Sequence, residues 1–308
     1  MQFPRFLVAS AALCAVAVAL AQSAPIPNAA PSPAAATVQI PPAPTPTGAA
    51  SWLIMDYSNG QVLASQNPDQ RLEPASITKV MTSYVVAAEL KAGKIKRTDQ
   101  VLISENAWRG GGGSTDGSTS FLPLNSTVSL DELERGMIIQ SGNDAAIALA
   151  EHVAGSEQAF TDLMNNYAKK IGMNNSHFVN PHGLSSPEHY STARDLALLG
   201  RAMIRDFPET YAYNKIRDYT VNGILQHNRN GLLWKDASVD GIKTGHTSAA
   251  GYCLLASAKR GEQRLISAVM GIQTASAAEG FRLRENGNLA LLNWGFRFFE
   301  TRTLYAPD

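Results

Sequence analysis

The sequence predicts an α+β fold in which an antiparallel sheet, with strands from both ends of the chain, is flanked by helices. Three observations predict it: a hairpin pattern near residue 52, a helix-forming stretch in the middle, and a second hairpin pattern followed by a helix near the C-terminus. Runs of strands separated from runs of helices are typical of α+β folds. We therefore expect the two hairpins to share one sheet.

Each hairpin is predicted from two short apolar runs that a turn sequence separates. Trp52 to Asp56 and Gln61 to Ser65 flank Ser58-Asn59-Gly60, and Asn-Gly between strand-like runs is a strong hairpin signal. In the second hairpin, Gly251 to Ala258 and Arg264 to Met270 are joined by a short turn that contains glycine.

Helices are predicted where apolar residues recur with helical spacing between capping residues. Pro74 opens a helix from about Ala75 to Leu90, and Ser129 with Glu132 forms a capping box for the next one. The remaining elements are predicted at about residues 130–139, 144–153, 157–171, 193–205 (with Thr192 as the cap) and 284–298 for helices, and 219–224 for a strand.

The N-terminal residues have the composition of an export signal and a linker. Arg5 precedes an apolar run that ends at a small-x-small sequence, so residues 1–21 are predicted to be a secretory signal peptide. Residues 22–50 are rich in Pro and Ala and are predicted to be an extended linker, which leaves residues 51–308 as one folded domain. Past the signal, Cys253 is the one remaining cysteine, so we expect a small buried side chain and no intrachain disulfide.

Charge and composition exclude some classes of function. The chain has 26 basic and 26 acidic residues and a formal net charge of zero, so nothing indicates nucleic acid as a partner. His-Glu-x-x-His and cysteine clusters are absent from the sequence, so neither a metal nor another cofactor is predicted.

Three short motifs occur in order along the chain: Ser76-x-x-Lys79, Ser141-Gly142-Asn143 and Lys243-Thr244-Gly245. Each alone is weak evidence, because a Ser-x-x-Lys is expected about once by chance in a chain of this length. The alternative for each alone is a solvated surface side chain. All three in this order, each in a suitable structural context, instead favour a serine nucleophile.

The predicted local structure gives these residue types a chemical role. Ser76 and Lys79 are one helical turn apart and share a face. Burial and a neighbouring cation, for which Lys243 is the candidate, lower the proton affinity of a lysine, so Lys79 can act as a base. We expect Ser141 on a rigid loop between two helices, and Gly245, just before the strand at Gly251, to leave room for a peptide beside a strand edge.

Longer segments around these motifs closely resemble the low-molecular-weight D-alanyl-D-alanine carboxypeptidases of the penicillin-binding protein 5 and 6 type. The resemblance covers about residues 51–301 and is carried by residues 74–84, 139–145, 182–184 (His182-Gly183-Leu184), 228–234, 239–247 and 294–301. It implies a penicillin-binding/β-lactamase-like transpeptidase fold. Members usually continue into a β-rich domain and a membrane anchor, which we expect to be absent because the sequence ends at Asp308.

The resemblance also implies roles for single residues. Ser76 would attack the carbonyl between two D-alanines of a peptidoglycan stem peptide, with Lys79 as base and Ser141 as proton relay. The other motif residues would bind the substrate. Asn143 would hydrogen-bond the substrate backbone, and Lys243 and Thr244 would supply positive potential and a hydroxyl near its carboxylate. The backbone N–H groups of Ser76 and His246 would donate to the oxyanion. β-Lactams would acylate the same serine. The resemblance and the predicted signal peptide place the protein in the periplasm, and the sequence does not decide whether it associates with the inner membrane.

Three further residues are candidates for the site, but each could instead have a purely structural role. Arg229 and Arg284 could bind the free carboxylate of the substrate, since arginine holds carboxylates bidentately, or could merely brace loops. His182 could line the cleft or merely pack.

Other functions stay open on the sequence. A D,D-endopeptidase uses the same motifs, a β-lactamase of the same superfamily would need a separate deacylating glutamate, and a non-catalytic wall-binding module would need none of the chemistry. Release of free D-alanine, cleavage of a cross-linked dimer and steady penicillin turnover distinguish these possibilities.

Overall fold

The computed structural model describes residues 40–111, 117–221 and 223–302. The predicted signal peptide and most of the predicted linker lie outside the described residues. From Pro41 onward the chain forms one compact unit, so packing begins ten residues before the boundary predicted from composition.

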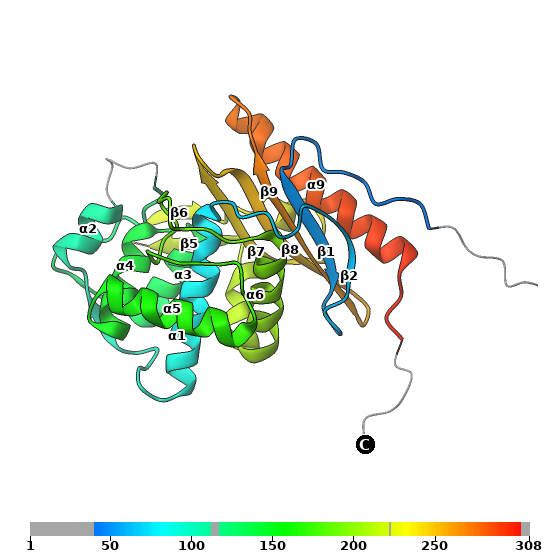
Figure 1. Ribbon diagram of the computed structural model, residues 1–308. Helices are drawn as coiled ribbons and strands as arrows, with labels where there is room; N and C mark the ends of the chain where they lie inside the picture. Colours follow the sequence, from blue (N-terminus) through cyan, green and yellow to red (C-terminus); the bar gives the residue numbers. More distant parts are fainter. Residues whose placement is uncertain (1–39, 112–116, 222, 303–308) are drawn as a thin grey trace, which may run out of the picture. The chain divides into compact units, whose positions relative to one another are not determined.

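A five-stranded sheet forms the centre of this unit (Figure 1), and its strand order is β2-β1-β9-β8-β7. Every pair in it is antiparallel. The strands span Ser51–Asp56 (β1), Val62–Gln66 (β2), Val239–Thr247 (β7), Gly251–Arg260 (β8) and Gln263–Ile272 (β9). The predicted sheet with strands from both chain ends is thus confirmed.

Helices cover both faces of the sheet, which explains why all six residues of β1 are buried. Helix α9 (Ala277–Phe298) covers one face and packs through Leu291, Leu292 and Trp294. On the other face lie α6 (Ala193–Asp206) and α1 (Thr78–Lys91), with the larger apolar cluster of the molecule beneath them. Strand β7 remains at the edge of the sheet, beside the start of α1.

The other helices form a block around α1. They are α2 (Glu105–Gly111), α3 (Leu130–Ile139), α4 (Asn143–Ala154), α5 (Glu157–Ile171), α7 (Pro208–Tyr211) and α8 (Leu232–Lys235), with 3-10 turns η1 (Ala75–Ile77) and η2 (Ala212–Lys215). Two small ribbons, β3 (Gln100–Leu102) with β4 (Thr127–Ser129) and β5 (Asp218–Val221) with β6 (Ile224–His227), complete the fold. The predicted caps are confirmed, because the hydroxyls of Ser129 and Thr192 accept the N–H groups of Glu132 and Asp195.

Three predicted elements need correction, and one strand was not predicted. The helix predicted from Ala75 begins as a 3-10 turn and becomes α-helical at Thr78. The strand predicted at residues 219–224 is a hairpin whose turn falls inside that range, and α9 begins at Ala277, capped by Ser276. Lys243-Thr244-Gly245 precedes the strand at Gly251 as predicted, but it also lies within a strand that was not predicted, β7, which matters most for the site.

Residues before β1 pack against α9. The side chain of Pro46 is buried against Gly287, and the indole N–H of Trp294 donates to the carbonyl of Pro41 over 2.9 Å. Cys253 is fully buried on β8, as predicted, and burial raises the pKa of its thiol to about 11. Of the helices in the part of the chain that the structure describes, none combines the length and the apolar character needed to cross a bilayer.

Candidate active site

The turn that carries Ser76 is a 3-10 turn held in an unusual backbone conformation. Ala75 has φ of 48°, in the left-handed region that non-glycine residues seldom occupy, and the turn then leads directly into α1. Ser76 is half-buried, and the Lys79 Nζ lies 3.0 Å from its Oγ. The predicted pairing of these two side chains is therefore present.

Three oxygens surround the Lys79 amine. Besides Ser76 Oγ, they are Asn143 Oδ1 and the carbonyl oxygen of His182, each 2.7 Å from Nζ. Lys79 is 1% exposed. Burial lowers the pKa of Lys79 to about 7, and the carboxylate of Asp144 opposes that shift.

One of the two predicted causes of this lowered pKa is present. Burial and Lys243 were both expected to lower it; burial does so, whereas Lys243 is not among the causes that act on Lys79. Repulsion between the two amines acts on Lys243, whose pKa lies well below its ordinary value because of burial and because of Lys79, Arg229 and Arg284. Lys243 is itself buried beneath the cleft.

The loop between α3 and α4 presents Ser141. Its backbone is left-handed, with φ of 70°, and its Oγ is buried without a hydrogen-bond partner among the described residues. The next residues fix the loop: the N–H of Asn143 donates to Ser118 O, and the Asp144 carboxylate accepts the N–H groups of Ser120 and Leu122. A rigid platform for the Ser141 hydroxyl was predicted, and these contacts provide it.

Strand β7 runs along the other side of Ser76. A Cβ atom on Gly245 would lie 2.7 Å from Pro74 O and 3.1 Å from the Ala75 Cβ. Gly245 was expected to leave room for a peptide, but the structure shows a nearer reason for glycine, which is the approach of the Ser76 turn. Thr244 and Gly245 face the cleft, and the exposed His246 stacks on Tyr252 with ring centroids 4.1 Å apart.

A tight turn at His182 closes the site behind Lys79. The Asn180 side chain accepts the N–H of Gly183 at 2.6 Å and donates to Leu184 O, so the turn is held from within. His182 Nδ1 accepts the N–H of Leu184, and burial lowers the pKa of His182 to about 3, which keeps the ring neutral. Thus His182 both lines the cleft and supplies, through its carbonyl, a contact to Lys79.

The two candidate arginines lie at one end of the cleft. Arg284 is 4% exposed, yet no carboxylate among the described residues lies within ion-pair distance, and its guanidinium donates only to Gly245 O and Arg229 O, both at 3.4 Å. Burial lowers its pKa to about 10. The Arg229 side chain is exposed and also lines the cleft.

The cleft between these elements has a volume of about 360 Å³. Its walls include most of the predicted site residues, namely Ser76, Ser141, Asn143, His182, Arg229, Thr244, Gly245, His246 and Arg284. Lys79 and Lys243 lie buried below this surface. Within the described ranges, no group of three or more His, Cys, Asp or Glu side chains is placed to hold a metal ion.

Sequence reasoning missed several contributors to the site. Asn180 and Asp144 organise two of the cleft walls through backbone hydrogen bonds, and Ser118 lies on the wall itself. Asn180 stands three residues before Gly183, a turn pattern that could have indicated its role. Asp144 follows Ser141-Gly142-Asn143 directly, but nothing in the sequence says which loop its carboxylate binds.

The comparisons with known proteins agree with this geometry. A family model described as D-alanyl-D-alanine carboxypeptidase matches residues 37–274. The chain is 53% identical over 262 residues to D-alanyl-D-alanine carboxypeptidase DacC of Escherichia coli, with 84% of this chain and 64% of that relative covered. It therefore spans a little less than two thirds of the length of this relative and of D-alanyl-D-alanine carboxypeptidase DacA of Escherichia coli.

Solved structures confirm the predicted fold. The crystal structure of penicillin-binding protein 5 from Haemophilus influenzae is 50% identical, with a TM-score of 0.77 and coverage of 82% of this chain and 72% of that one. Penicillin-binding protein D2 from Listeria monocytogenes, in its ampicillin-bound form, is 29% identical, with a TM-score of 0.71 and coverage of 81% and 97%. On the family match and these similarities, the chain belongs to the S11 peptidase family of D-alanyl-D-alanine carboxypeptidases.

Proposed function

We propose that this protein is a serine D-alanyl-D-alanine carboxypeptidase that removes the terminal D-alanine from peptidoglycan stem pentapeptides through an acyl-enzyme on Ser76. The proposed catalytic domain is residues 51–308, and residues 1–21 direct export to the periplasm. Membership of the family supports the reaction, and the cleft geometry supports the assignment of residues.

The observation that carries the proposal is the set of three oxygens around the Lys79 amine. A neutral amine has two N–H donors and one lone pair. Asn143 Oδ1 and His182 O can accept the two N–H groups, which leaves the lone pair directed at the Ser76 hydroxyl. Since burial brings the pKa of Lys79 to about 7, this neutral form is well populated near neutrality.

The proposed reaction proceeds in two stages. Lys79 Nζ takes the hydroxyl proton as Ser76 Oγ bonds to the carbonyl carbon between the two D-alanines. When the C–N bond breaks, the departing amine receives that proton through Ser141, and the shortened peptide stays esterified to Ser76. Water then attacks the ester carbon, transfers a proton through the same groups, and releases the acid and the free serine.

Positive charge at the far end of the cleft suits a substrate with a free carboxylate. Arg284 is a buried guanidinium that lies beside Gly245 O without a carboxylate partner among the described residues. Together with Arg229, Lys243 and the Thr244 hydroxyl, it is proposed to bind the terminal carboxylate. We propose the backbone N–H groups of Ser76 and His246 as donors to the oxyanion, an interaction often worth about 3 kcal/mol of barrier.

β-Lactams are proposed as inhibitors that acylate the same serine. A protein of similar fold, 29% identical over a match that covers 81% of this chain, has been solved in an ampicillin-bound form. Association with the inner membrane stays open in this proposal.

Mass spectrometry of the intact protein tests the proposal directly. Wild-type protein should gain one penicillin mass and should release free D-alanine from a stem pentapeptide, whereas Ser76→Ala should do neither. Activity that survives in Ser76→Ala would show that the nucleophile is misassigned. Cleavage of a cross-linked dimer without release of D-alanine would favour an endopeptidase, and rapid loss of the adduct with steady penicillin turnover would favour a β-lactamase.

A further inference from the structure

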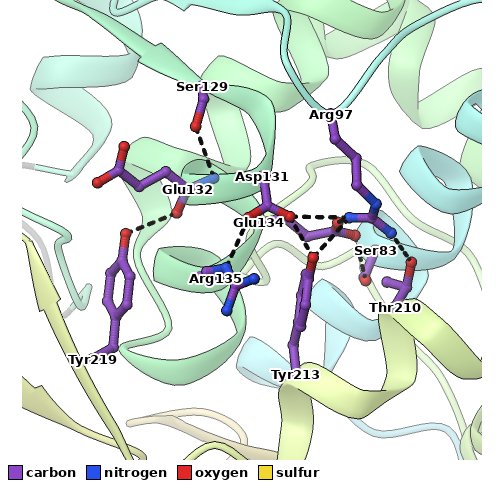
Figure 2. A network of polar contacts seen from close by, with 10 residues as sticks. All are labelled: Ser83, Arg97, Ser129, Asp131, Glu132, Glu134, Arg135, Thr210, Tyr213 and Tyr219. Carbon is purple, nitrogen blue, oxygen red and sulfur yellow. Dashed lines mark hydrogen bonds and ion pairs between the residues drawn. The ribbon is translucent and has the colours of Figure 1, made fainter.

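A polar network away from the cleft joins the helix that carries Lys79 to the helix that leads to Ser141 (Figure 2). Its members come from α1, from the segment after α1, from α3, and from α7 and η2. They are Ser83 on α1 and Arg97 in the segment after it; Asp131, Glu134 and Arg135 on α3; and Thr210 on α7 with Tyr213 in η2. None of them lines the cleft described above.

Glu134 is the buried centre of this network. Its side chain is fully buried, Oε1 accepts the Ser83 hydroxyl at 3.1 Å, and Oε2 accepts a guanidinium N–H of Arg97 at 2.9 Å. Arg97 also donates to Thr210 Oγ1 at 2.8 Å and to Tyr213 at 3.1 Å. The Glu134 carboxylate thus connects α3 directly to α1 and, through Arg97, to α7 and η2.

These contacts lie close to the catalytic groups along both helices. Ser83 is four residues after Lys79, which places it on the same face of α1 one turn further on. Glu134 lies five residues before the end of α3 at Ile139, about one and a half helical turns, and Ser141 follows two residues later. The Ser141 hydroxyl has no hydrogen-bond partner among the described residues, so its backbone sets its place. That backbone is held on one side by the contacts of Asn143 and Asp144 and on the other by the end of α3.

The charges around Glu134 act in opposite directions. Burial is the main influence and raises the pKa of Glu134 to about 7; Arg97 and the Ser83 hydroxyl lower the pKa, and Asp131 raises it further. Tyr213 and Arg135 both bind Asp131 rather than Glu134. The ionisable groups of α4, which also packs against α3, are bonded elsewhere: Asp144 to residues 119–122, Glu151 to Ser104 and Asn106, and His152 to Asp99.

We propose that Glu134 is a positioning residue: through Ser83 and Arg97 its carboxylate fixes α3, and with it Ser141, relative to the Ser76–Lys79 turn. The inference rests on the proposed function, because it concerns the geometry of that reaction. Ionised Glu134 accepts both hydrogen bonds with charge assistance. Protonated Glu134 loses its charge-assisted bond to Arg97, so the link between α1 and α3 loosens and Ser141 shifts from its position beside the reacting atoms.

The proposal predicts a distinctive dependence on pH. Glu134→Gln reproduces the uncharged form of the side chain at every pH. Misplacement by about 1 Å can reduce a rate up to about a hundredfold, and we expect a loss of about tenfold in this variant above neutrality. Well below neutrality wild type is protonated as well, so the ratio of wild-type to variant rates should fall to about one as the pH drops through roughly 7.

The experiment measures the rate of acylation by a fluorescent penicillin, and of D-alanine release, from about pH 5 to about pH 9. Taking the ratio cancels the titration of Lys79, which is common to both proteins. Glu132→Gln is the matched control, since Glu132 is an exposed glutamate on the same helix, and its ratio to wild type should stay near one throughout. Ser83→Ala, which leaves the Arg97–Glu134 pair intact, should show a loss above neutrality that likewise disappears in acid.

Each outcome decides the matter. The positioning role is overturned if the ratio of wild-type to Glu134→Gln rates is the same at every pH, including a ratio of one throughout. This holds whatever the thermal stability of the variant. If Glu134→Gln proves too unstable to assay, Ser83→Ala takes its place. A ratio of wild-type to Ser83→Ala rates that does not vary with pH then overturns the positioning role of Glu134. A wild-type protein that takes up no penicillin and releases no D-alanine overturns the proposed function itself, which separates that failure from the failure of this inference.

Discussion

Lys79 differs from a surface lysine because its amine is buried among neutral oxygens. Asn143 Oδ1 and His182 O carry only partial charges, and the carboxylate of Asp144 opposes the loss of the proton without preventing it. Burial therefore lowers the pKa of Lys79 from 10.5 to about 7. Asn143 and His182 take part in this chemistry as acceptors for the amine, besides any role in binding substrate.

The rate of acylation should rise with pH through the pKa of Lys79. Below about pH 7 the amine is protonated and has no lone pair for the Ser76 proton, so kcat/KM falls; above it the neutral base dominates. Lys79→Arg should lose nearly all activity at every pH, because a guanidinium does not lose its proton in the working range. A stopped-flow pH profile of penicillin acylation measures both effects.

Lys91→Arg is the matched control, since Lys91 is an exposed lysine on the same helix. It should keep the wild-type profile. Robust turnover by Lys79→Arg would remove lysine as the base, and a flat profile between about pH 5 and 8 would contradict the lowered pKa.

At the scale of elements, the cleft depends on how closely two turns and the strand β7 approach one another. Gly183 has φ of 91°, and a Cβ atom there would lie 1.9 Å from Ala75 O. A Cβ on Gly245 would meet Pro74 O from the opposite side at 2.7 Å. The Ser76 turn is therefore held between the His182 turn and β7, and only glycine permits both approaches.

Gly183→Ala should displace the Ser76 turn and reduce kcat/KM by more than about tenfold, since small misplacements of reacting groups are costly. Gly172→Ala is the matched control. Gly172 has the same φ of 91°, but nothing lies within 4 Å of the position that a Cβ atom would take there. Both variants should lose about 1 kcal/mol or more to backbone strain. Equal activity losses in the two would mean that strain, and not the contact with Ala75, matters.

At the scale of the whole molecule, the sheet brings the two ends of the described chain together. β1 pairs with β9, more than two hundred residues later, and Thr301 donates to the Asp56 carboxylate at 2.6 Å. The Trp294 indole reaches Pro41 O from α9. Segments before and after the helical block thus stabilise one core on which the edge strand β7 rests.

Trp294→Phe should weaken this closure. It leaves Pro41 O without its indole donor and should cost about 1 kcal/mol, which corresponds to a fall of about 2–4 °C in Tm for a domain of this size. Differential scanning calorimetry measures it, with Trp108→Phe as control because Trp108 is exposed. An unchanged Tm in Trp294→Phe would show that the Pro41 contact adds nothing to stability.

Local patterns were sufficient for most of the elements. The Asn59-Gly60 turn, the Ser129 capping box, the Thr192 cap and the hairpin of β8 and β9 are present as predicted. Errors arose where a local signal was present but was not used. The sequence Asn222-Gly223 is a hairpin signal of the same kind as Asn59-Gly60, yet the hairpin of β5 and β6 was taken for one strand. β7 was overlooked although only three residues separate it from β8.

By itself the sequence determined the candidates for the reaction, because Ser76, Lys79, Ser141 and Lys243 stand in motifs whose residue types and spacing suit a serine nucleophile and its base. Only the tertiary structure decided what surrounds them: the carbonyl of His182 at the Lys79 amine, Asp144 beneath the loop of residues 119–122, and Glu134 between two helices. The physical reason is that hydrogen-bond partners and burial depend on contacts between residues far apart in the chain. Those contacts, not residue type, set the pKa of a buried amine or carboxylate.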